Sequence, residues 1–448
     1  MSGIAGTNQP GKEEVVSQML DKISHRGGAV SKIREVKNAT IGIVCTEVQA
    51  DTVVRLKEEN EVVDHAGSGH LALAKAKDDG VILKRDRLGV APLYFGWDEK
   101  NELYFASEVK ALLDYCTKID QVPPGHTFDG ERAIPYFELK KKKPLEKSSG
   151  EIAEKLKQRL ISSVEKRIEM GGIVGSWLSG GLDSSTMAAL ARPYVSKLHT
   201  FAAGFPDAPD MEHAREVADF IKSDHHEVIV SFKDLLDTLP DVIYYLESFD
   251  ALLVRSSITN YLVAKRASEY VDAVFSGEGG DELFAGYEYL RNVDQDDLAD
   301  ELIDLTARLH NTALQRVDRS ASAHGTVAHV GFLDPDVVDY ALRIPVEFKL
   351  RDDVEKWILR RAMVGELPER ILNRKKSKFW EGAGVGELIF EYADKKISDT
   401  EFTQERTLPN GWMINTKEEL MHYRVFKEHF GELEDLSWMG RTKGAPKQ

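Results

Sequence analysis

The stretch from residue 176 to residue 187 constrains the fold of this chain more than any other, and it reads Ser-Trp-Leu-Ser-Gly-Gly-Leu-Asp-Ser-Ser-Thr-Met. The apolar run Ile173–Leu178 leads into it, and apolar residues at positions 187, 190, 191 and 194 follow it at helical spacing. This order predicts a buried strand, a glycine turn and a helix N-terminus. Backbone N–H groups at the start of a helix, reached closely across glycines, favour a bound anion. We therefore expect an anion cradle at this turn.

The side chains of the turn indicate phosphate bound together with a cation. Ser179 and Ser184 add hydroxyl donors, and Gly180 and Gly181 let a ligand approach the backbone. The carboxylate of Asp183 would repel bare phosphate, so a divalent cation such as Mg²⁺ is expected between them. The Gly-Lys-Ser/Thr ending of the Walker P-loop is absent. The stretch is instead similar to the pyrophosphatase loop of ATP-dependent adenylating enzymes.

Length and composition exclude several classes of protein. A chain of 448 residues should form two or three domains, and its 42% apolar and 30% charged residues are those of a globular protein. The net charge of −16 argues against a nucleic-acid partner. We see neither a signal peptide nor an apolar run long enough to cross a membrane, so we expect a cytoplasmic protein without a membrane partner. Cys45 and Cys116 are expected to be buried thiols.

Residues 1–137 predict a first domain of short strands joined by turns. Runs of β-forming residues are separated by Gly, Asp and Asn, and they are Ala39–Val44, Glu61–Val63, Gly80–Leu83, Leu93–Gly96 and Leu103–Ala106. Residues 138–150 are rich in lysine and end in Ser-Ser-Gly, which is typical of a solvated linker.

Residues 151–448 predict a second domain of a different class. A helix with an apolar residue every fourth position begins near Glu151. Strand-like runs then alternate with helical segments, which indicates a doubly wound parallel sheet; the runs are Ile173–Leu178, Leu198–Phe205, His226–Phe232 and Val271–Phe275. From about Asp294 onward the pattern is mainly helical. Ligands of such sheets bind beyond the carboxyl ends of the strands.

A second loop at such a strand end carries three acidic residues. It follows Val271–Phe275 and reads Ser-Gly-Glu-Gly-Gly-Asp-Glu-Leu-Phe-Ala-Gly-Tyr over residues 276–287. Carboxylates at the start of a helix can simply stabilise that helix through its dipole. Three of them facing a phosphate cradle are better explained by a cation, and we expect Asp183 and Asp281 to hold one Mg²⁺ between them.

Together the two loops resemble those of the asparagine synthetase family, whose members share Ser-Gly-Gly-Leu-Asp-Ser and Ser-Gly-Glu-Gly-x-Asp-Glu. Further segments match in the same order, and they are His199–Phe205, Asp210–Val217, His225–Glu227, Asp241–Asp250, Lys356–Arg360 and Arg374–Gly382. The resemblance implies an ATP-pyrophosphatase domain with a helical C-terminal part. It also implies a ligase in which a carboxylate attacks ATP, giving an acyl-adenylate and pyrophosphate, before an amine displaces AMP.

The resemblance also assigns roles to single residues. Arg255 and Lys376 would offset phosphate charge, and Glu278 would take a proton from the attacking amine. Lys376 would also stabilise the tetrahedral intermediate. The cofactors implied are ATP and Mg²⁺. Trp177 is equally well explained as a core aromatic residue. The residues expected to frame the nucleotide and its pyrophosphate are Trp177, Ser179, Gly180, Gly181, Asp183, Ser184, Ala203, Ser276 and Gly277.

The first domain is similar to the family's glutamine amidotransferase domain but lacks its nucleophile. Glutamine-using members begin with a processed cysteine, where this chain has Ser2, and a hydroxyl is a far weaker nucleophile than a thiol. The family's Arg-Leu-Ser and Asn-Gly-Glu segments have no counterpart, and the domain is shortened between Gly42 and Gly80. We expect a shortened α+β sandwich of the Ntn-hydrolase type that has lost glutaminase activity.

Three functions remain open at this stage. The first is amide formation from aspartate and free ammonia. The second is the same chemistry on another carboxylate, including intramolecular closure as in β-lactam synthetases, because Val327, His329 and Gly331 stand where asparagine synthetases carry a glutamate, an arginine and a proline. The third is a catalytically silent scaffold, which the retained acidic and basic site residues disfavour. The surface left by the shortened domain also predicts a homodimer.

Overall fold

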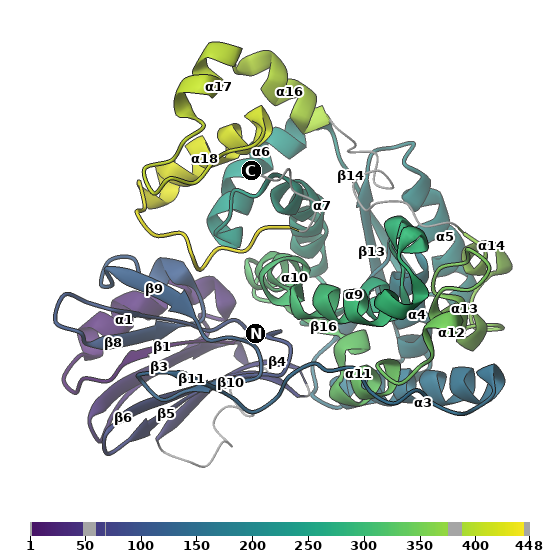
Figure 1. Ribbon diagram of the computed structural model, residues 1–448, viewed down its shortest axis with the longest axis horizontal. Coiled ribbons are helices and arrows are strands. Elements are labelled where there is room, and N and C mark those ends of the chain that lie inside the picture. Colours follow the sequence, from purple (N-terminus) through teal and green to yellow (C-terminus); the bar gives the residue numbers. More distant parts are fainter. Residues whose placement is uncertain (1, 48–59, 68, 375–387, 443–448) are drawn as a thin grey trace.

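The computed structural model describes residues 2–47, 60–67, 69–374 and 388–442. Within these residues the strands form three sheets (Figure 1). The strands are β1 Ser2–Thr7, β2 Val30–Val36, β3 Ala39–Cys45, β4 Glu61–Gly67, β5 His70–Lys77, β6 Gly80–Arg85, β7 Tyr94–Trp97, β8 Leu103–Ala106, β9 Lys118–Gln121, β10 His126–Phe128, β11 Ala133–Pro135, β12 Val174–Trp177, β13 His199–Gly204, β14 Asp224–Ile229, β15 Ala273–Ser276 and β16 Val327–Val330.

The N-terminal part is a sandwich of two antiparallel sheets. Their strand orders are β2-β3-β1-β8-β7-β9 and β11-β10-β6-β5-β4. Helix α1 (Glu13–Lys22) buries Val16, Met19 and Leu20 against the first sheet. The five predicted strands of this part are confirmed, with small shifts of their ends. Sequence reasoning missed β1, β2, β5, β9, β10 and β11.

The missed strands have physical explanations. All six residues of β1 are buried, and its sequence of small residues, Ser-Gly-Ile-Ala-Gly-Thr, shows no alternation. Gly6 is needed there, because a Cβ would lie 2.5 Å from the Phe105 ring and 2.6 Å from the Thr40 carbonyl. Strand β2 lies at a sheet edge and is mostly polar. Such strands carry a weak apolar signal.

The third sheet is parallel throughout, in the order β14-β13-β12-β15-β16. Helices cover both of its faces, with α4 and α5 on one and α7 and α10 on the other (Figure 1). The helices after α1 are α3 Ser149–Ile168, α4 Leu182–Ala191, α5 Pro209–Ile221, α6 Phe232–Leu246, α7 Ala251–Ala267, α8 Gly280–Phe284, α9 Gln295–Ala307, α10 Ala313–Ser322, α11 Pro335–Ala341, α12 Val346–Lys349, α13 Trp357–Ala362, α14 Glu369–Leu372, α16 Leu388–Lys396, α17 Asp399–Glu405 and α18 Lys417–Phe430.

The order of this sheet places the ligand site. The chain moves outward from β12 through β13 to β14, then returns to β15 on the other side of β12. Adjacent strands whose connections leave in opposite directions open a crevice at their carboxyl ends. The two sequence-predicted loops follow β12 and β15, so both lie at this crevice.

The prediction of an all-helical C-terminal part was incomplete. Strand β16 extends the sheet beyond β15, with Val327 opposite Ala273 and Val330 opposite Ser276. A four-residue strand is too short for a periodicity signal, and its pairing partner lies far away in the chain. Val327 and His329 are therefore buried sheet residues.

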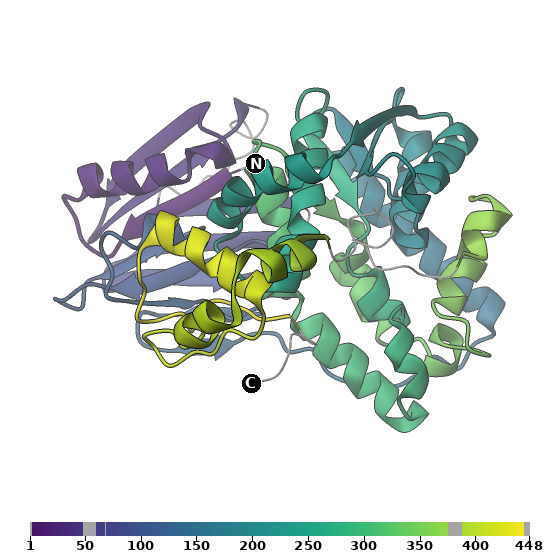
Figure 2. The ribbon, with the colours of Figure 1, turned by 90° about the horizontal axis from the view of Figure 1, so that it is seen from above.

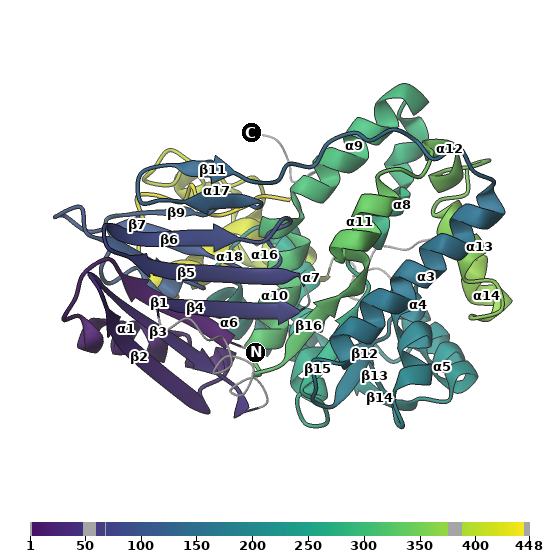
Figure 3. The same ribbon diagram turned by 90° about the horizontal axis from the view of Figure 1, so that it is seen from below.

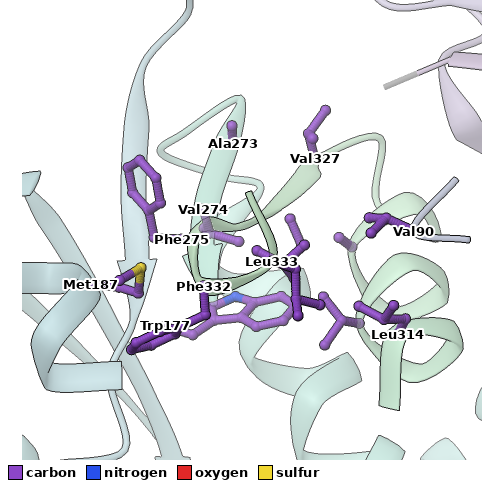
Figure 4. Packing of buried hydrophobic residues seen from close by; sticks show 14 of the residues in the cluster. Val90, Trp177, Met187, Ala273, Val274, Phe275, Leu314, Val327, Phe332 and Leu333 are labelled. Carbon is purple, nitrogen blue, oxygen red and sulfur yellow. The ribbon is translucent and has the colours of Figure 1, made fainter. Parts of the chain in front are cut away.

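The two halves of the chain share a continuous core. Strand β4 of the sandwich lies beside β16 of the parallel sheet (Figure 3). Val90 from the N-terminal half belongs to the same buried cluster as Trp177, Phe275 and Leu314, whose packing is drawn in Figure 4. Helix α18 packs on α6 and α7, α16 and α17 pack on α18, and the three helices lie alongside the sandwich (Figure 2).

The linker differs in detail from the expectation. Helix α3 already begins at Ser149, because Ser148 and Glu151 form a capping box. Lys142 is not simply solvated, since its Nζ lies 2.5 Å from a carboxylate oxygen of Asp339.

Candidate active site

The loop after β12 is held in shape by its own hydroxyls. Ser184 Oγ lies 3.0 Å from Ser179 Oγ and accepts the N–H of Ser179 at 3.2 Å. Gly180 has a φ of +69°, and a Cβ there would lie 2.4 Å from the Cβ of His213 on α5. Only glycine fits this backbone and this contact. The turn thus directs the start of α4 toward the crevice.

The loop after β15 packs directly against the first loop. A Cβ on Gly277 would lie 2.7 Å from the backbone nitrogen of Ser184. A Cβ on Gly280 would lie 2.5 Å from the carboxyl carbon of Asp183. Gly277, which the resemblance places beside the nucleotide, and Gly280 therefore let the two acidic loops approach each other.

A cavity of about 730 Å³ opens at this crevice. Of the site residues predicted from sequence, those that line it are Trp177, Ser179, Gly181, Asp183, Ser184, Ala203, Arg255, Ser276, Gly277, Glu278 and Asp281. Gly180 lies behind the loop against α5. Lys376 lies outside the described residues. A cavity of this size holds a small-molecule ligand.

Asp183 and Asp281 meet at one cation, which is Lys356. Its Nζ lies 2.5 Å from Asp183 Oδ2 and 2.6 Å from Asp281 Oδ1. Burial alone would lower the pKa of Lys356, but the two carboxylates outweigh it and raise the pKa above its usual value. Lys356 is therefore a permanent positive charge between the two acids.

This arrangement fits the predicted Mg²⁺. Two carboxylates from separate strand ends converge on one point of positive charge, and Mg²⁺ binds through one or two carboxylates together with phosphate oxygens. The hard oxygen donors suit this cation. The assignment of Asp183 and Asp281 as its ligands stays a prediction.

Glu278 is held by an arginine. The guanidinium of Arg316, on α10, donates to a carboxylate oxygen of Glu278, and both side chains line the cavity. Burial opposes the charge of Arg316, but Glu278 outweighs burial and raises the pKa of Arg316. The pair fixes the Glu278 carboxylate at the cavity wall.

Arg255 lines the cavity and is also paired. Its Nε donates to Glu418 Oε1 at 3.0 Å, and its Nη2 donates to the other oxygen of the same carboxylate. Glu418 belongs to α18, so this forked contact ties the C-terminal helix to the cavity wall.

Trp177 was predicted either to frame the nucleotide or to be a core aromatic residue, and its position fits both predictions. It belongs to the buried apolar cluster and also lines the cavity. Its indole N–H is buried and has no hydrogen-bond acceptor within the described part of the chain. An acceptor supplied by a ligand would satisfy it.

A second cluster of charges surrounds Ser2 in the sandwich. Ser2 is fully buried, and its hydroxyl donates to Asp64 at 3.0 Å. Arg26 donates to the Ser2 carbonyl at 2.9 Å, and its guanidinium pairs with three carboxylates at 2.8–3.1 Å, namely Asp64, Glu108 and Asp318. Burial raises the pKa of Asp64 although Arg26 opposes it.

This buried cluster crosses between the halves of the chain. Asp318 lies on α10, and its neighbour Arg319 pairs with Glu108 at 3.0 Å and with Glu247 at 3.0 Å. The residues of the cluster are buried, and Ser2 does not line the large cavity.

Sequence reasoning assigned no role to Lys356 or Arg316. Lys356 begins one of the matching segments, but the partners of both residues are distant in the chain. Their roles follow from the charged partners that they meet at the cavity, and these partners come together only in the folded chain.

Comparisons with known proteins identify the family of the chain. The family model described as asparagine synthase matches residues 155–302 and 292–445. The chain belongs to the asparagine synthase family. A second model, the glutamine amidotransferase domain, matches residues 36–114. The sheet topology confirms the predicted class of fold, since a sandwich of two antiparallel sheets precedes a doubly wound parallel sheet.

Relatives cover most of the chain. An asparagine synthetase [glutamine-hydrolyzing] 2 of Lotus japonicus is 32% identical over 86% of this chain and 70% of its own length. Asparagine synthetase B [glutamine-hydrolyzing] of Escherichia coli (strain K12) is 32% identical over 82% of this chain and 70% of its own length. A probable asparagine synthetase [glutamine-hydrolyzing] of Schizosaccharomyces pombe (strain 972 / ATCC 24843) is 35% identical, with coverages of 79% and 70%.

Membership in the asparagine synthase family makes the protein an ATP-dependent carbon–nitrogen ligase that acts on small molecules. Among solved structures, a glutamine-dependent NAD⁺ synthetase from Acinetobacter baumannii aligns with a TM-score of 0.27 and 15% identity, over 75% of this chain and 56% of that chain. No helix in the described ranges is long and apolar enough to cross a membrane.

Proposed function

We propose that this protein forms an amide from aspartate and free ammonia at the expense of ATP, and that it does not use glutamine. The observation that carries the proposal is a contrast of two sites. The predicted adenylation residues line a cavity of about 730 Å³, whereas Ser2 is sealed in a buried charge cluster.

The residues of the cavity have complementary tasks in adenylation. The loop at Ser179–Ser184 and the start of α4 offer N–H and hydroxyl donors to pyrophosphate. Asp183 and Asp281 would hold Mg²⁺, which when bound neutralises phosphate charge. Lys356 holds the two carboxylates together, which reduces the reorganisation needed on binding. The proposed roles of Arg255 and Lys376 remain those implied by the family.

Glu278 is the proposed base in the second step. A carboxylate oriented by Arg316 at the cavity wall can accept a proton from the attacking amine as the carbon–nitrogen bond forms and AMP leaves. The fixed orientation matters because proton transfer requires hydrogen-bond distance to the amine.

Loss of glutaminase activity is supported by the surroundings of Ser2. Its hydroxyl is engaged by Asp64, its carbonyl by Arg26, and its side chain has no exposed surface. A glutamine substrate needs both space and an accessible nucleophile, whereas Ser2 is fully buried beside Arg26 and the three carboxylates that pair with it. The ammonia would therefore come from solution.

A pyrophosphate-release screen tests the substrate assignment. Purified protein with ATP, Mg²⁺, aspartate and ammonium should form AMP, pyrophosphate and asparagine in equal amounts. If aspartate gives no AMP while another carboxylate does, the assignment of aspartate is wrong and the adenylation chemistry stands. If titration calorimetry detects no binding of Mg-ATP, the silent scaffold is favoured.

We also propose domain boundaries at residues 1–137 and 151–448 with a linker at 138–150. Strands β1–β11 build the two sandwich sheets and β12–β16 build the parallel sheet, which supports this division. The homodimer stays a prediction.

A further inference from the structure

We propose that His199, Asp224 and His226 form a binding site for one divalent transition metal of the Zn²⁺ type, which fastens the edge strand of the parallel sheet. The site goes beyond the proposed amide synthesis. One ligand atom from each of the three residues lies within 4.8 Å of the other two.

Strand register brings the three side chains together. In the parallel pairing of β13 and β14, His199 lies opposite Asp224 and Phe201 lies opposite His226. Side chains two residues apart on a strand share a face. All three ligand residues therefore project from one face of two adjacent strands.

The distances suit a metal of this size. His199 Nδ1 lies 2.9 Å from His226 Nε2 and 3.6 Å from Asp224 Oδ2, and His226 Nε2 lies 4.0 Å from the same oxygen. A point about 2.1 Å from all three atoms exists inside this triangle, and 2.0–2.2 Å is the bond length of Zn²⁺ to imidazole nitrogen and carboxylate oxygen.

The surroundings favour the neutral imidazoles that metals require. Partial burial lowers the pKa of His199 and of His226. The ring of Tyr270 packs on His226 at 4.2 Å between centroids, and the ring of Phe201 stacks on His226 at 5.0 Å, so the imidazole is held in place. The histidine that now donates the N–H···N bond moves its proton to its other ring nitrogen when metal binds, so no net proton is released.

Asp224 is accessible and can exchange its present partner. Its carboxylate is 43% exposed and contacts Lys197 Nζ at 2.6 Å. Lys197 is 61% exposed, so its side chain can leave the carboxylate for solvent when a metal arrives. Three protein ligands leave a fourth tetrahedral position for water on this open side.

The site lies at the opposite end of the sheet from the proposed active site. His199 and Asp224 are the first residues of β13 and β14, whereas the cavity lies at the carboxyl ends of the strands. None of the three ligand residues lines that cavity. A metal here joins β14, the edge strand, to β13 without touching the nucleotide site.

The test is titration of the full chain with Zn²⁺ in millimolar Mg²⁺, which competes with Zn²⁺ for oxygen ligands such as the carboxylates of Asp183 and Asp281. The inference predicts one Zn²⁺ per chain, a higher melting temperature, and the visible absorption of tetrahedral Co²⁺ when cobalt replaces zinc. His226→Asn and Asp224→Asn should each weaken Zn²⁺ binding about 100-fold. Loss of a residue that only supports a metal ligand already weakens metal binding by up to about 100-fold, and loss of a direct ligand should weaken it at least as much.

His225→Asn is the matched control, because this neighbouring histidine projects from the opposite face and contacts Thr200 at 3.0 Å. It should bind Zn²⁺ like the unaltered protein. Asp224→Asn changes an exposed side chain, so it keeps the test valid if His226→Asn does not fold. Substoichiometric Zn²⁺, absence of the cobalt bands, or equal affinity in Asp224→Asn and the unaltered protein would overturn the inference.

Discussion

The Ser2 cluster and the adenylation cavity contain the same kinds of charged groups but use them differently. Around Ser2, Arg26 joins Asp64, Glu108 and Asp318 in a core that excludes solvent. At the cavity, Lys356 joins Asp183 and Asp281 at a wall that faces about 730 Å³ of open space. A charge network closed on itself is structural, whereas one that borders a cavity can transfer its interactions to a ligand.

The largest expected effect is on the cavity. Asp281→Asn removes one of the two carboxylates proposed to hold Mg²⁺, and AMP formation should fall about 10³-fold, roughly 4 kcal/mol of transition-state stabilisation. A coupled assay for AMP measures it. Asp237→Asn, an exposed residue of α6 paired with Lys233, is the control and should keep full activity. Equal activities of the two variants would contradict the proposed role of Asp281.

Arg26→Met should act on stability. It leaves buried carboxylates without their cation, and the free energy of unfolding should fall by about 3 kcal/mol. Denaturant unfolding measures it, with Arg132→Met as a control because Arg132 is exposed and makes a long ion pair with Asp129 at 3.8 Å. An unchanged unfolding free energy in Arg26→Met would mean that the Ser2 cluster does not hold the halves together.

Buried His70 should contribute to the pH dependence of stability. Burial is the main cause that lowers the pKa of His70 to about 3, and its Nε2 lies 2.9 Å from the Leu333 carbonyl. The folded state thus binds the proton more weakly than the unfolded state, so this stability is complete above pH 6.5 and is lost as the pH falls toward 3. Between pH 6.5 and 5 the loss should be about 2 kcal/mol. Denaturant unfolding across this range should show that the free energy of unfolding changes less steeply with pH in His70→Gln than in the unaltered protein. Equal slopes in the two proteins would exclude His70 as the cause.

Arg316→Lys tests orientation within the cavity. The charge beside Glu278 is kept but the planar fork is lost. We expect kcat to fall about 10-fold, or about 1.4 kcal/mol, with little change in the KM for ATP. An effect on the KM for ATP alone would place Arg316 in nucleotide binding instead.

Ser2→Ala should have the smallest effect. It removes one hydrogen bond to Asp64, which keeps its contacts with Arg26 and Ser107, so unfolding should become easier by only about 1 kcal/mol. Ammonium-supported AMP formation should not change. A loss of that activity would show that Ser2 takes part in the reaction.

The sequence predicts those parts of the site that are local in the chain. The Ser179 and Ser276 loops were recognised because strand, glycine turn and helix start follow one another within a dozen residues. Lys356 was not assigned, since it meets Asp183 across 173 positions, and the Arg255–Glu418 pair spans 163. Such contacts depend on tertiary packing and leave no local pattern. Short strands such as β16 were missed for the same reason, because partners rather than propensity define them.

The central claim is that the cavity has kept its chemistry while the Ser2 region has become structural. The most direct test compares AMP formation from ATP, Mg²⁺ and aspartate with either ammonium or glutamine as nitrogen donor. The account predicts turnover with ammonium and none above background with glutamine, in the unaltered protein and in Ser2→Ala alike. Glutamine-supported turnover that disappears in Ser2→Ala would contradict it.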